Sequence, residues 1–359
     1  MGIDPRGYSS SRIDPRLLGK MDSVSGILEA IIDRPLSLDE AQELAYYLLN
    51  KASDVEIAAV LAALRARGEA PSEVAGFSLA LRRAALHVNV DKPILDTAGT
   101  GGDGSNTINV STASALLAAY LGARVVKHGN RSASGRSGSA DLMESLGYNI
   151  THPPSTAECM IRRVRFTFLY APLYHKLMAH VMPVRRKLGI RTIFNLAGPL
   201  ANPAEPNTQI LGVPDPQLVD VMSNAGPLLG YDKLVIVHGY PRIDEVSVSG
   251  PTMVAESGKT GKRKYTVTPE ELGIEPCPLE ELRINSPSES ALRIINAMKG
   301  RGRRCDVSFI AANTGMAIYA AGLASTPQRG VSMALDALES GDVAGYIDAV
   351  IDASRGCTG

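Results

Sequence analysis

The chain has 359 residues, 45% of them hydrophobic and 21% charged, and its 37 basic and 37 acidic side chains give no formal net charge. This length exceeds what one hydrophobic core usually supports, so we expect two domains. The neutral charge argues against a general nucleic-acid or membrane-surface binder. No apolar run approaches the roughly 18 residues of a membrane span, and the N-terminus lacks the apolar segment of a secretory signal. We therefore expect neither a nucleic-acid nor a membrane partner.

The first part of the chain has a helical pattern. Two serines lie three residues before a glutamate, which is the spacing of a capping box at a helix N-terminus: Ser37 with Glu40, and Ser53 with Glu56. After the second box, apolar residues recur on one helix face as far as Gly68, a typical helix stop. We predict a small helical domain over 22–90, preceded by a flexible arm over 1–21, which has few residues to bury.

Short apolar runs alternate with helical segments after Pro93. The runs PILDTA, RVVKHG, FTFLYAP, TQILGV and KLVIVHG predict buried strands, and STASALLAAYLGA and SADLMESLG predict helices between them. This alternation predicts an α/β fold over 91–355, with a mostly parallel central sheet flanked by helices. Ligands of such sheets gather at the carboxyl ends of the strands, so we expect two glycine-rich loops, which follow the first two runs, at the same edge.

The first of these loops, LDTAGTGGDGSNTINV, has four glycines within the six residues from Gly99 to Gly104. The glycines match G-x-G-x-x-G, but the following helix begins too late for a dinucleotide-binding motif, and the second strand does not end in an acidic residue. A Walker A loop is excluded because no Gly-Lys-Ser/Thr follows. Bare main-chain N–H groups before a helix N-terminus favour an anion cradle. A tight packing turn is the alternative.

The second loop, KHGNRSASGRSGSAD, combines cations with small polar residues. Lys127, Arg131 and Arg136 lie among glycines and hydroxyl side chains. Such donors suit a polyanionic ligand, although a solvated flexible loop is the alternative for this segment alone. Together the two loops predict a phosphate-binding edge.

An acidic pair follows the run KLVIVHG. Asp244 and Glu245 lie in the segment IDEVSVSG. Adjacent carboxylates at a strand end can hold Mg²⁺, which prefers oxygen ligands and usually bridges to substrate phosphates. A surface acidic pair is the alternative, but the two phosphate-type loops at the same edge favour the metal.

The four cysteines lie far apart and form no C-x-x-C pair: Cys159, Cys277, Cys305 and Cys357. This spacing disfavours both a zinc site and a disulfide framework. We predict free thiols, with Cys159 and Cys305 as inert packing residues, and a cytoplasmic protein.

Four segments together resemble the anthranilate phosphoribosyltransferase family: GTGGDGSNTINVSTASA, KHGNRSASGRSGSAD, VRRKLGIRTIFNLAGPLANPA and IDEVSVSG. The resemblance runs in order from about residue 24 to about residue 350. It implies a small helical domain, completed by segments around 175–195, and a large phosphoribosyl-binding α/β domain. It also implies a homodimer that associates through the helical domain. One departure from the family pattern is Lys176 after His175, where proline is common.

The resemblance also implies roles for individual residues. Contacts to the phosphoribosyl substrate would come from the first loop and the helix start, namely Gly99, Gly102, Asp103, Thr107, Asn109, Val110, Ser111 and Thr112. The second loop would add Lys127, His128, Gly129, Asn130, Arg131, Ser132, Ala133, Ser134, Gly135 and Ser139. Ser111, Asp244 and Glu245 would be Mg²⁺ ligands. Gly99, Asn130 and Arg185 would contact anthranilate, and its pocket or access path would be lined by His128, His175, Gly198 and Pro199.

The implied activity joins phosphoribosyl pyrophosphate to the amine of anthranilate, in tryptophan biosynthesis. The nearest alternative is a pyrimidine nucleoside phosphorylase, which would share the fold and the glycine loop. It would not explain the acidic pair beside a pyrophosphate site, or the segments KHGNR and GPLANP. A non-catalytic nucleic-acid-binding protein of the same fold is a second alternative, against which the neutral charge and the acidic pair argue.

Overall fold

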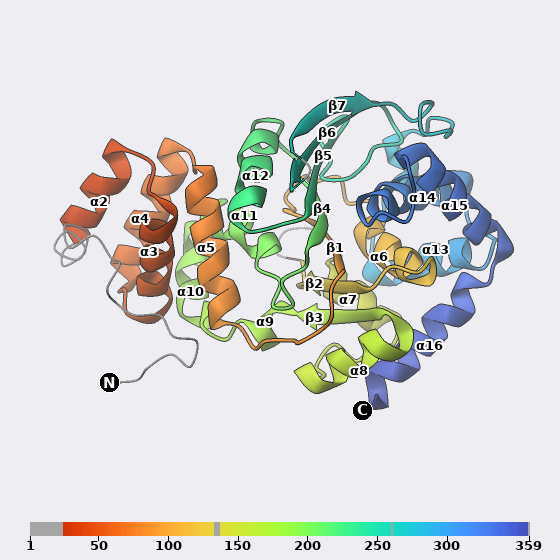
Figure 1. The fold of residues 1–359 in the computed structure, drawn as a ribbon, viewed down its shortest axis with the longest axis horizontal. Helices are drawn as coiled ribbons and strands as arrows, with labels where there is room; N and C mark the ends of the chain where they lie inside the picture. Colours follow the sequence, from red (N-terminus) through yellow and green to blue (C-terminus); the bar gives the residue numbers. More distant parts are fainter. Residues whose placement is uncertain (1–23, 133–136, 260, 358–359) are drawn as a thin grey trace.

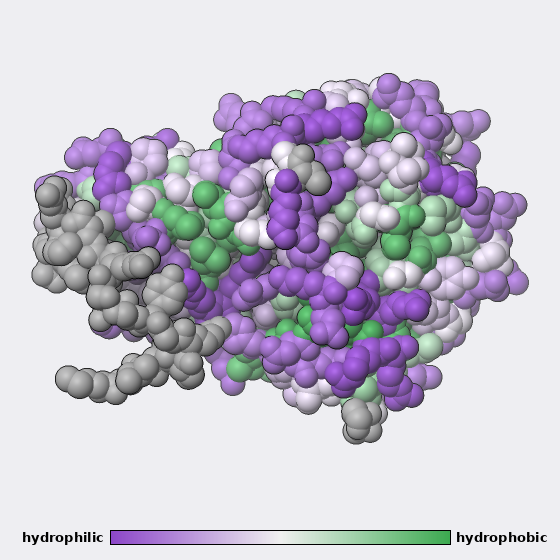
Figure 2. Space-filling view, viewed as in Figure 1, coloured by the Kyte–Doolittle hydropathy of each residue, from purple (hydrophilic) through white to green (hydrophobic). Residues whose placement is uncertain are grey.

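The computed structural model describes residues 24–132, 137–259 and 261–357, and the predicted N-terminal arm lies outside them. Within this part of the chain, a group of helices lies at one end and a sheet covered by further helices forms the rest (Figure 1). Figure 2 shows a largely hydrophilic face with two hydrophobic areas, one over α5 (Pro71–Ala84) in the first group and one over the helices at the right of the view. None of the described helices combines the length and the apolar character needed to cross a bilayer.

In the described part of the chain, the helical domain contains four early helices: α2 (Val24–Asp33), α3 (Leu38–Asn50), α4 (Asp54–Arg67) and α5. Both predicted capping boxes are present at the starts of α3 and α4. Gly68 ends α4 with a φ of 92°, a conformation that favours glycine. Local sequence signals therefore set these helix ends as predicted.

Two later helices complete the core of this domain. They are α10 (Met178–Leu188) and α11 (Ile193–Ala197). Val181 of α10 and Phe194 of α11 are buried in the same hydrophobic cluster as Leu48 and Leu61. The ring of Phe194 meets that of Phe77 edge-on, with centroids 5.4 Å apart. The small domain is thus built from two distant parts of the chain.

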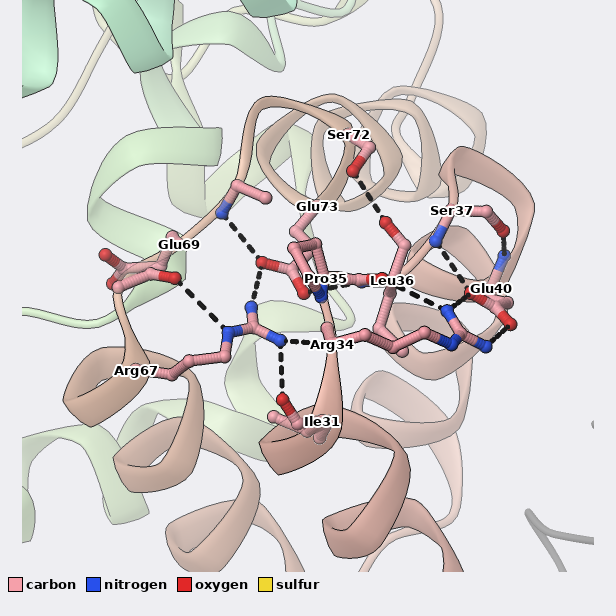
Figure 3. Close-up of polar contacts among 12 residues, drawn as sticks. Ile31, Arg34, Pro35, Leu36, Ser37, Glu40, Arg67, Glu69, Ser72 and Glu73 are labelled. Carbon is pink, nitrogen blue, oxygen red and sulfur yellow. Dashed lines mark hydrogen bonds and ion pairs between the residues drawn. The ribbon is translucent and has the colours of Figure 1, made fainter.

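A buried ion pair joins the turns between the first helices (Figure 3). The guanidinium of Arg67 contacts Glu73 and also donates to the carbonyl oxygens of Ile31 and Arg34, each at 2.6 Å. The other oxygen of Glu73 accepts from the N–H of Leu36 at 2.9 Å. The Glu73 side chain is fully buried, so its charge depends on these donors.

We expect Glu73→Ala to destabilise the helical domain strongly. The change removes the partner of the half-buried Arg67 guanidinium and the acceptor of the N–H groups of Leu36 and Ala70, which together should cost about 3 kcal/mol. Urea unfolding followed by circular dichroism measures the change in free energy of unfolding. Glu29→Ala, an exposed glutamate on α2, is the control, and equal losses in both variants would contradict the role of the network.

Among the described residues, seven strands form one sheet in the order β3-β2-β1-β4-β5-β6-β7. They are β1 (Leu95–Gly99), β2 (Val125–Gly129), β3 (Phe166–Tyr170), β4 (Thr208–Gly212), β5 (Lys233–Gly239), β6 (Thr252–Gly258) and β7 (Arg263–Val267). The first five pair in parallel, and β6 and β7 join antiparallel. The predicted α/β fold class is confirmed, whereas the two antiparallel strands were not predicted.

Helices cover both faces of the sheet (Figure 1). Their bounds are α6 (Val110–Tyr120), α7 (Ser139–Ser145), α8 (Pro154–Val164), α9 (Ala171–Tyr174), α12 (Gln217–Leu228), α13 (Pro287–Met298), α14 (Arg304–Ala320), α15 (Pro327–Ser340) and α16 (Val343–Gly356), with short 3-10 turns η2 (Gly198–Leu200) and η3 (Leu279–Leu282). Neighbouring strand residues face opposite layers. Ile210 of β4 lies in the cluster that contains α6 and α14 residues, and Leu211 lies in the cluster of α12. Val74 of α5 joins the α12 cluster, so the two domains share a core.

The prediction of free thiols was wrong. Cys159 of α8 is bonded to Cys357 after α16, and Cys277 is bonded to Cys305 at the start of α14. The partners are 198 and 28 residues apart in sequence. The fold brings these pairs together, and no local spacing indicates them, which is why the C-x-x-C criterion missed both.

Replacing Cys159 and Cys357 together with alanine is expected to lower the free energy of unfolding by about 2–4 kcal/mol, because the bond restricts the unfolded chain. The pair Cys277 and Cys305 closes a shorter loop and should contribute less. Thermal unfolding of each variant, with and without reductant, measures both effects. A wild-type melting temperature unaffected by reductant, and equal to that of both variants, would contradict the prediction.

Candidate active site

Four neighbouring parallel strands each end in a glycine at the same edge of the sheet: Gly99, Gly129, Gly212 and Gly239. At two of them the need for glycine is steric. A Cβ on Gly99 would lie 2.2 Å from Oδ2 of Asp244. A Cβ on Gly212 would lie 1.5 Å from the carbonyl oxygen of Asp244. The ends of β1 and β4 thus make room for the acidic segment that follows β5.

The glycines of the first loop are needed for their backbone conformation. Gly101, Gly102 and Gly104 have φ values of 70°, 79° and 69°, which side chains disfavour. A Cβ on any of the three would have no atom within 4 Å. The loop therefore turns three times in the left-handed region and leaves open space beside its backbone. The alternative of a tight packing turn does not account for this space.

Three carboxyl groups meet beside this loop. The N–H of Gly101 donates to Oδ2 of Asp244 at 2.7 Å. Burial, and next the charge of Asp103, raise the pKa of Asp244 to about 7. Burial and the charge of Asp244 raise the pKa of Glu245 well above its ordinary value. Mutual repulsion of this kind is relieved by a cation.

The carboxyl cluster fits a Mg²⁺ ion that takes part of its ligands from elsewhere. In the described part of the chain, no group of three His, Cys, Asp or Glu side chains could by itself hold a metal ion. Mg²⁺ commonly binds through one or two carboxylates and completes its shell with water and substrate phosphate. Asp244 and Glu245 present that partial set, next to the hydroxyl-bearing start of α6.

Lys127 lies beneath the loops, facing the interior. Its side chain is 1% exposed, and its ammonium donates to the carbonyl oxygen of Thr97 at 2.5 Å and lies 3.5 Å from Oγ of Ser111. Burial lowers its pKa, while the charges of Asp96 and Glu245 raise it. The structure therefore places this cation as a counter-charge behind the acidic pair.

Asp96 and Asn202 join β1 to β2 behind the site and were not among the predicted site residues. Asp96 is fully buried, and its Oδ2 accepts from Nδ2 of Asn202 at 2.9 Å. The same amide donates to the carbonyl of Val126 at 2.7 Å. Burial raises the pKa of Asp96 to about 6, against the opposing charge of Lys127. The sequence did contain one indication of this contact, because Asp96 is an acidic residue inside the apolar run PILDTA.

The second loop is held by contacts at both ends. Arg131 is an exposed cation that pairs with both oxygens of Glu144, at 2.5 and 2.8 Å. The carbonyl of Asn130 accepts from the N–H of Ala140 at 3.1 Å and from Oγ of Ser139 at 3.2 Å. Ala133, Ser134 and Gly135, which were predicted to bind substrate, lie outside the described residues together with Arg136.

Asn109 connects the first loop to the second. It precedes α6 as its N-cap residue, and its Nδ2 donates to the carbonyl oxygen of Ser137 at 3.0 Å. The hydroxyl of Ser137 donates back to Oδ1 of Asn109 at 2.7 Å. The two predicted phosphate-binding loops are therefore physically coupled through this side chain.

Two buried imidazoles lie together, with ring centroids 4.9 Å apart. They belong to His128 at the end of β2 and His175 after α9. Among the described residues, Nε2 of His128 has no hydrogen-bond partner. Burial lowers the pKa of His175 to about 4 and that of His128 well below its usual value. Burial thus favours the neutral form of both rings.

Arg185 of α10 is a half-buried guanidinium. It donates to Oδ1 of Asn195 at 3.2 Å and lies 5.5 Å above the ring of Phe194. Burial lowers its pKa, and no acidic side chain among the described residues acts in the opposite direction. Such a cation suits an incoming anion. The hydrogen bonds described for Arg185 do not reach the glycine loop.

A helical bundle that shares a core with an α/β domain, with a glycine-rich loop beside an acidic pair, is the arrangement of a glycosyl transferase. The family models agree with this class. The helical bundle domain of the glycosyl transferase family matches residues 26–85, and its a/b domain matches residues 91–344.

Comparison with similar proteins identifies the family within this class to which the chain belongs. An anthranilate phosphoribosyltransferase of Aeropyrum pernix is 50% identical over 90% of this chain and 94% of its own length. The crystal structure of the Thermus thermophilus enzyme is 40% identical, with a TM-score of 0.87 over 92% of this chain and 99% of that one. The Saccharomyces cerevisiae enzyme in complex with PRPP and Mg is 26% identical, with a TM-score of 0.81 over 96% and 99% of the two chains. The chain belongs to the anthranilate phosphoribosyltransferase family, and the predicted resemblance is confirmed.

Proposed function

We propose that this protein transfers the 5-phosphoribosyl group of phosphoribosyl pyrophosphate to the amine of anthranilate, a step of tryptophan biosynthesis. The products are N-(5-phosphoribosyl)anthranilate and pyrophosphate. The observation that carries the proposal is the open glycine loop, which donates an N–H to Asp244, next to the interacting charges of Asp103 and Glu245. A loop that binds anions beside a site that binds cations suits a metal-bound diphosphate.

The donor would lie along the first loop and the start of α6. Main-chain N–H groups of residues 99–104 would bind phosphate oxygens, because no side chain obstructs them. The positive end of α6 would add to the attraction. The coupling through Asn109 would bring the second loop to the same substrate, and the residues named from the family motifs remain our proposed contacts.

The metal site would be formed by Ser111, Asp244 and Glu245. Mg²⁺ bound there neutralises the charge that develops on the leaving pyrophosphate. Lys127 balances the buried carboxylates from behind, since its ammonium interacts with both Asp96 and Glu245. We assign Lys127 this positioning role in addition to its proposed place in the donor site.

The acceptor would be held by Arg185, whose planar guanidinium can bind both oxygens of the anthranilate carboxylate. The neutral rings of His128 and His175, with Gly198 and Pro199, would line the aromatic pocket. The amine then forms a bond to C1 of the ribose as the bond to pyrophosphate breaks and the amine loses a proton, through an oxocarbenium-like state. The protein mainly holds the two reactants in line.

We further propose a homodimer formed through the helical domain. The support is the family resemblance, and the same domain carries two exposed apolar side chains, Ile32 of α2 and Val55 of α4. Light scattering after size exclusion measures the mass. We also propose a cytoplasmic location on the ground of the metabolic substrates alone, because the argument from free thiols no longer holds.

The proposed activity is tested by mixing the protein with anthranilate, phosphoribosyl pyrophosphate and Mg²⁺. We expect anthranilate fluorescence to fall with time, and to stay constant when the donor or the metal is left out. Phosphorolysis of thymidine and uridine is assayed in parallel. Constant fluorescence together with phosphorolysis would replace our proposal with the nucleoside phosphorylase alternative.

A further inference from the structure

A distant segment of the chain braces the glycine loop. Residues 281–284, which we call the bracing segment, lie at the end of η3 and before α13. The N–H of Ile108 donates to the carbonyl of Leu282 at 3.0 Å, and the N–H of Ile284 donates to the carbonyl of Asn106 at 2.8 Å. Thr107 and Arg283 form an antiparallel bridge between these two bonds. The glycine loop thus ends in a short ladder with the bracing segment.

Arg293 of α13 holds the other side of the bracing segment. Its guanidinium donates to the carbonyl oxygen of Arg283 at 2.7 Å and to that of Glu281 at 2.6 Å. The carbonyls of residues 281 and 283 therefore face Arg293. The carbonyl of Leu282 and the N–H of Ile284 face the glycine loop. Arg293 is fixed in turn by both oxygens of Asp306 on α14. Both side chains are buried, where such pairs have little freedom to move.

Ser290, one turn earlier on α13, holds the residue at which the loop becomes a helix. Its fully buried hydroxyl accepts from the N–H of Asn109 at 3.0 Å. It also donates to Oδ1 of Asn109 at 2.9 Å. Asn109 is the N-cap residue of α6, two residues before Ser111. One hydroxyl on α13 thus sets both the backbone and the side chain of the residue that links the two loops.

We propose that Ser290 and Arg293 are positioning residues for the phosphorylated donor, acting through Asn109 and the bracing segment. The inference rests on the proposed function of the glycine loop as the donor site. A glycine-rich backbone samples many conformations when unsupported, and ordering it on binding lowers affinity. The two α13 side chains hold the loop in shape before the donor arrives, so their loss weakens donor binding and leaves acceptor binding unchanged.

The test compares two buried serines that make similar hydrogen bonds. Ser290→Ala removes the support of Asn109. Ser354→Ala on α16 is the matched control, because its hydroxyl also accepts a backbone N–H, that of Asn149 at 3.0 Å, and donates to an oxygen, that of Ile351 at 2.6 Å. We expect Ser290→Ala to raise the KM for phosphoribosyl pyrophosphate about five- to tenfold, the scale of one or two lost hydrogen bonds, with an unchanged KM for anthranilate. Ser354→Ala should change neither constant.

A double-mutant cycle separates positioning from general destabilisation. If Ser290 acts through Asn109, Ser290→Ala should have a smaller effect on donor affinity in an Asn109→Ala background, where only its bond to the backbone N–H of residue 109 remains to be lost. Calorimetric titration with phosphoribosyl pyrophosphate and Mg²⁺ measures this affinity without turnover. A wild type that binds the donor but does not consume anthranilate would reject the proposed function and leave this comparison valid. Equal donor affinities of wild type and Ser290→Ala, or additive effects in the cycle, would overturn the inference.

Discussion

Replacement of Asp244 by asparagine and Glu245 by glutamine is expected to lower turnover at least about 100-fold, the scale typical of lost electrostatic stabilisation of a developing charge. The dependence of the remaining rate on Mg²⁺ should weaken at the same time. The reason is the arrangement of these carboxyls beside Asp103, where burial and repulsion raise their pKa values. Amides keep the shape of the site but remove the charge that we propose binds the cation.

A Mg²⁺ titration of the rate at saturating donor measures this effect. Glu270→Gln with Glu271→Gln provides a matched control, because these neighbouring glutamates are exposed at the surface. The control should keep the wild-type titration. If the double amide variant also keeps the wild-type Mg²⁺ titration, the assignment of the metal to the acidic pair is refuted.

Replacement of Arg185 by alanine is expected to raise the KM for anthranilate roughly 10- to 100-fold, since a hydrogen bond to a charged group contributes about 1.5–3 kcal/mol. The KM for the donor should change little. The guanidinium is half-buried, no acidic side chain among the described residues opposes its desolvation, and it lies over the ring of Phe194. Its charge is therefore available for the carboxylate of the acceptor.

The neighbouring Arg186→Ala is the control for Arg185, because Arg186 is exposed on the same helix. Arg185→Lys should recover only part of the affinity, since an ammonium lacks the planar fork that binds two oxygens. Steady-state kinetics with each substrate varied in turn separates the effects. Equal increases in both KM values for Arg185→Ala would show a general disturbance of the site and would contradict the proposed contact with the anthranilate carboxylate.

Much of the fold was predictable because its signals are local. The capping boxes at Ser37 and Ser53 depend on residues three positions apart. The five parallel strands are short, mostly apolar runs, and four of them end in a glycine. The strands β6 and β7 were not predicted because their sequences, TMVAESG and RKYTV, mix charged with apolar residues. Such strands take their place by pairing with a neighbour already in the sheet, which composition does not reveal.

The site was predictable to the extent that it lies in contiguous motifs. The glycine loop and the acidic pair follow strand ends, and parallel strands bring those ends to one edge. The direction of the Lys127 side chain was not predictable, because a lysine in a strand is usually solvated and here faces Asp96. Asp96 with Asn202, Ser290 with Asn109, and both disulfides join parts of the chain that only the tertiary structure brings together.

The most direct test of the donor site is a crystal structure with phosphoribosyl pyrophosphate and Mn²⁺ in place of Mg²⁺. We expect density for the diphosphate along residues 99–112 and an anomalous peak bound by Asp244 or Glu245. Donor density elsewhere on the protein, with no peak next to either carboxylate, would contradict the proposed site.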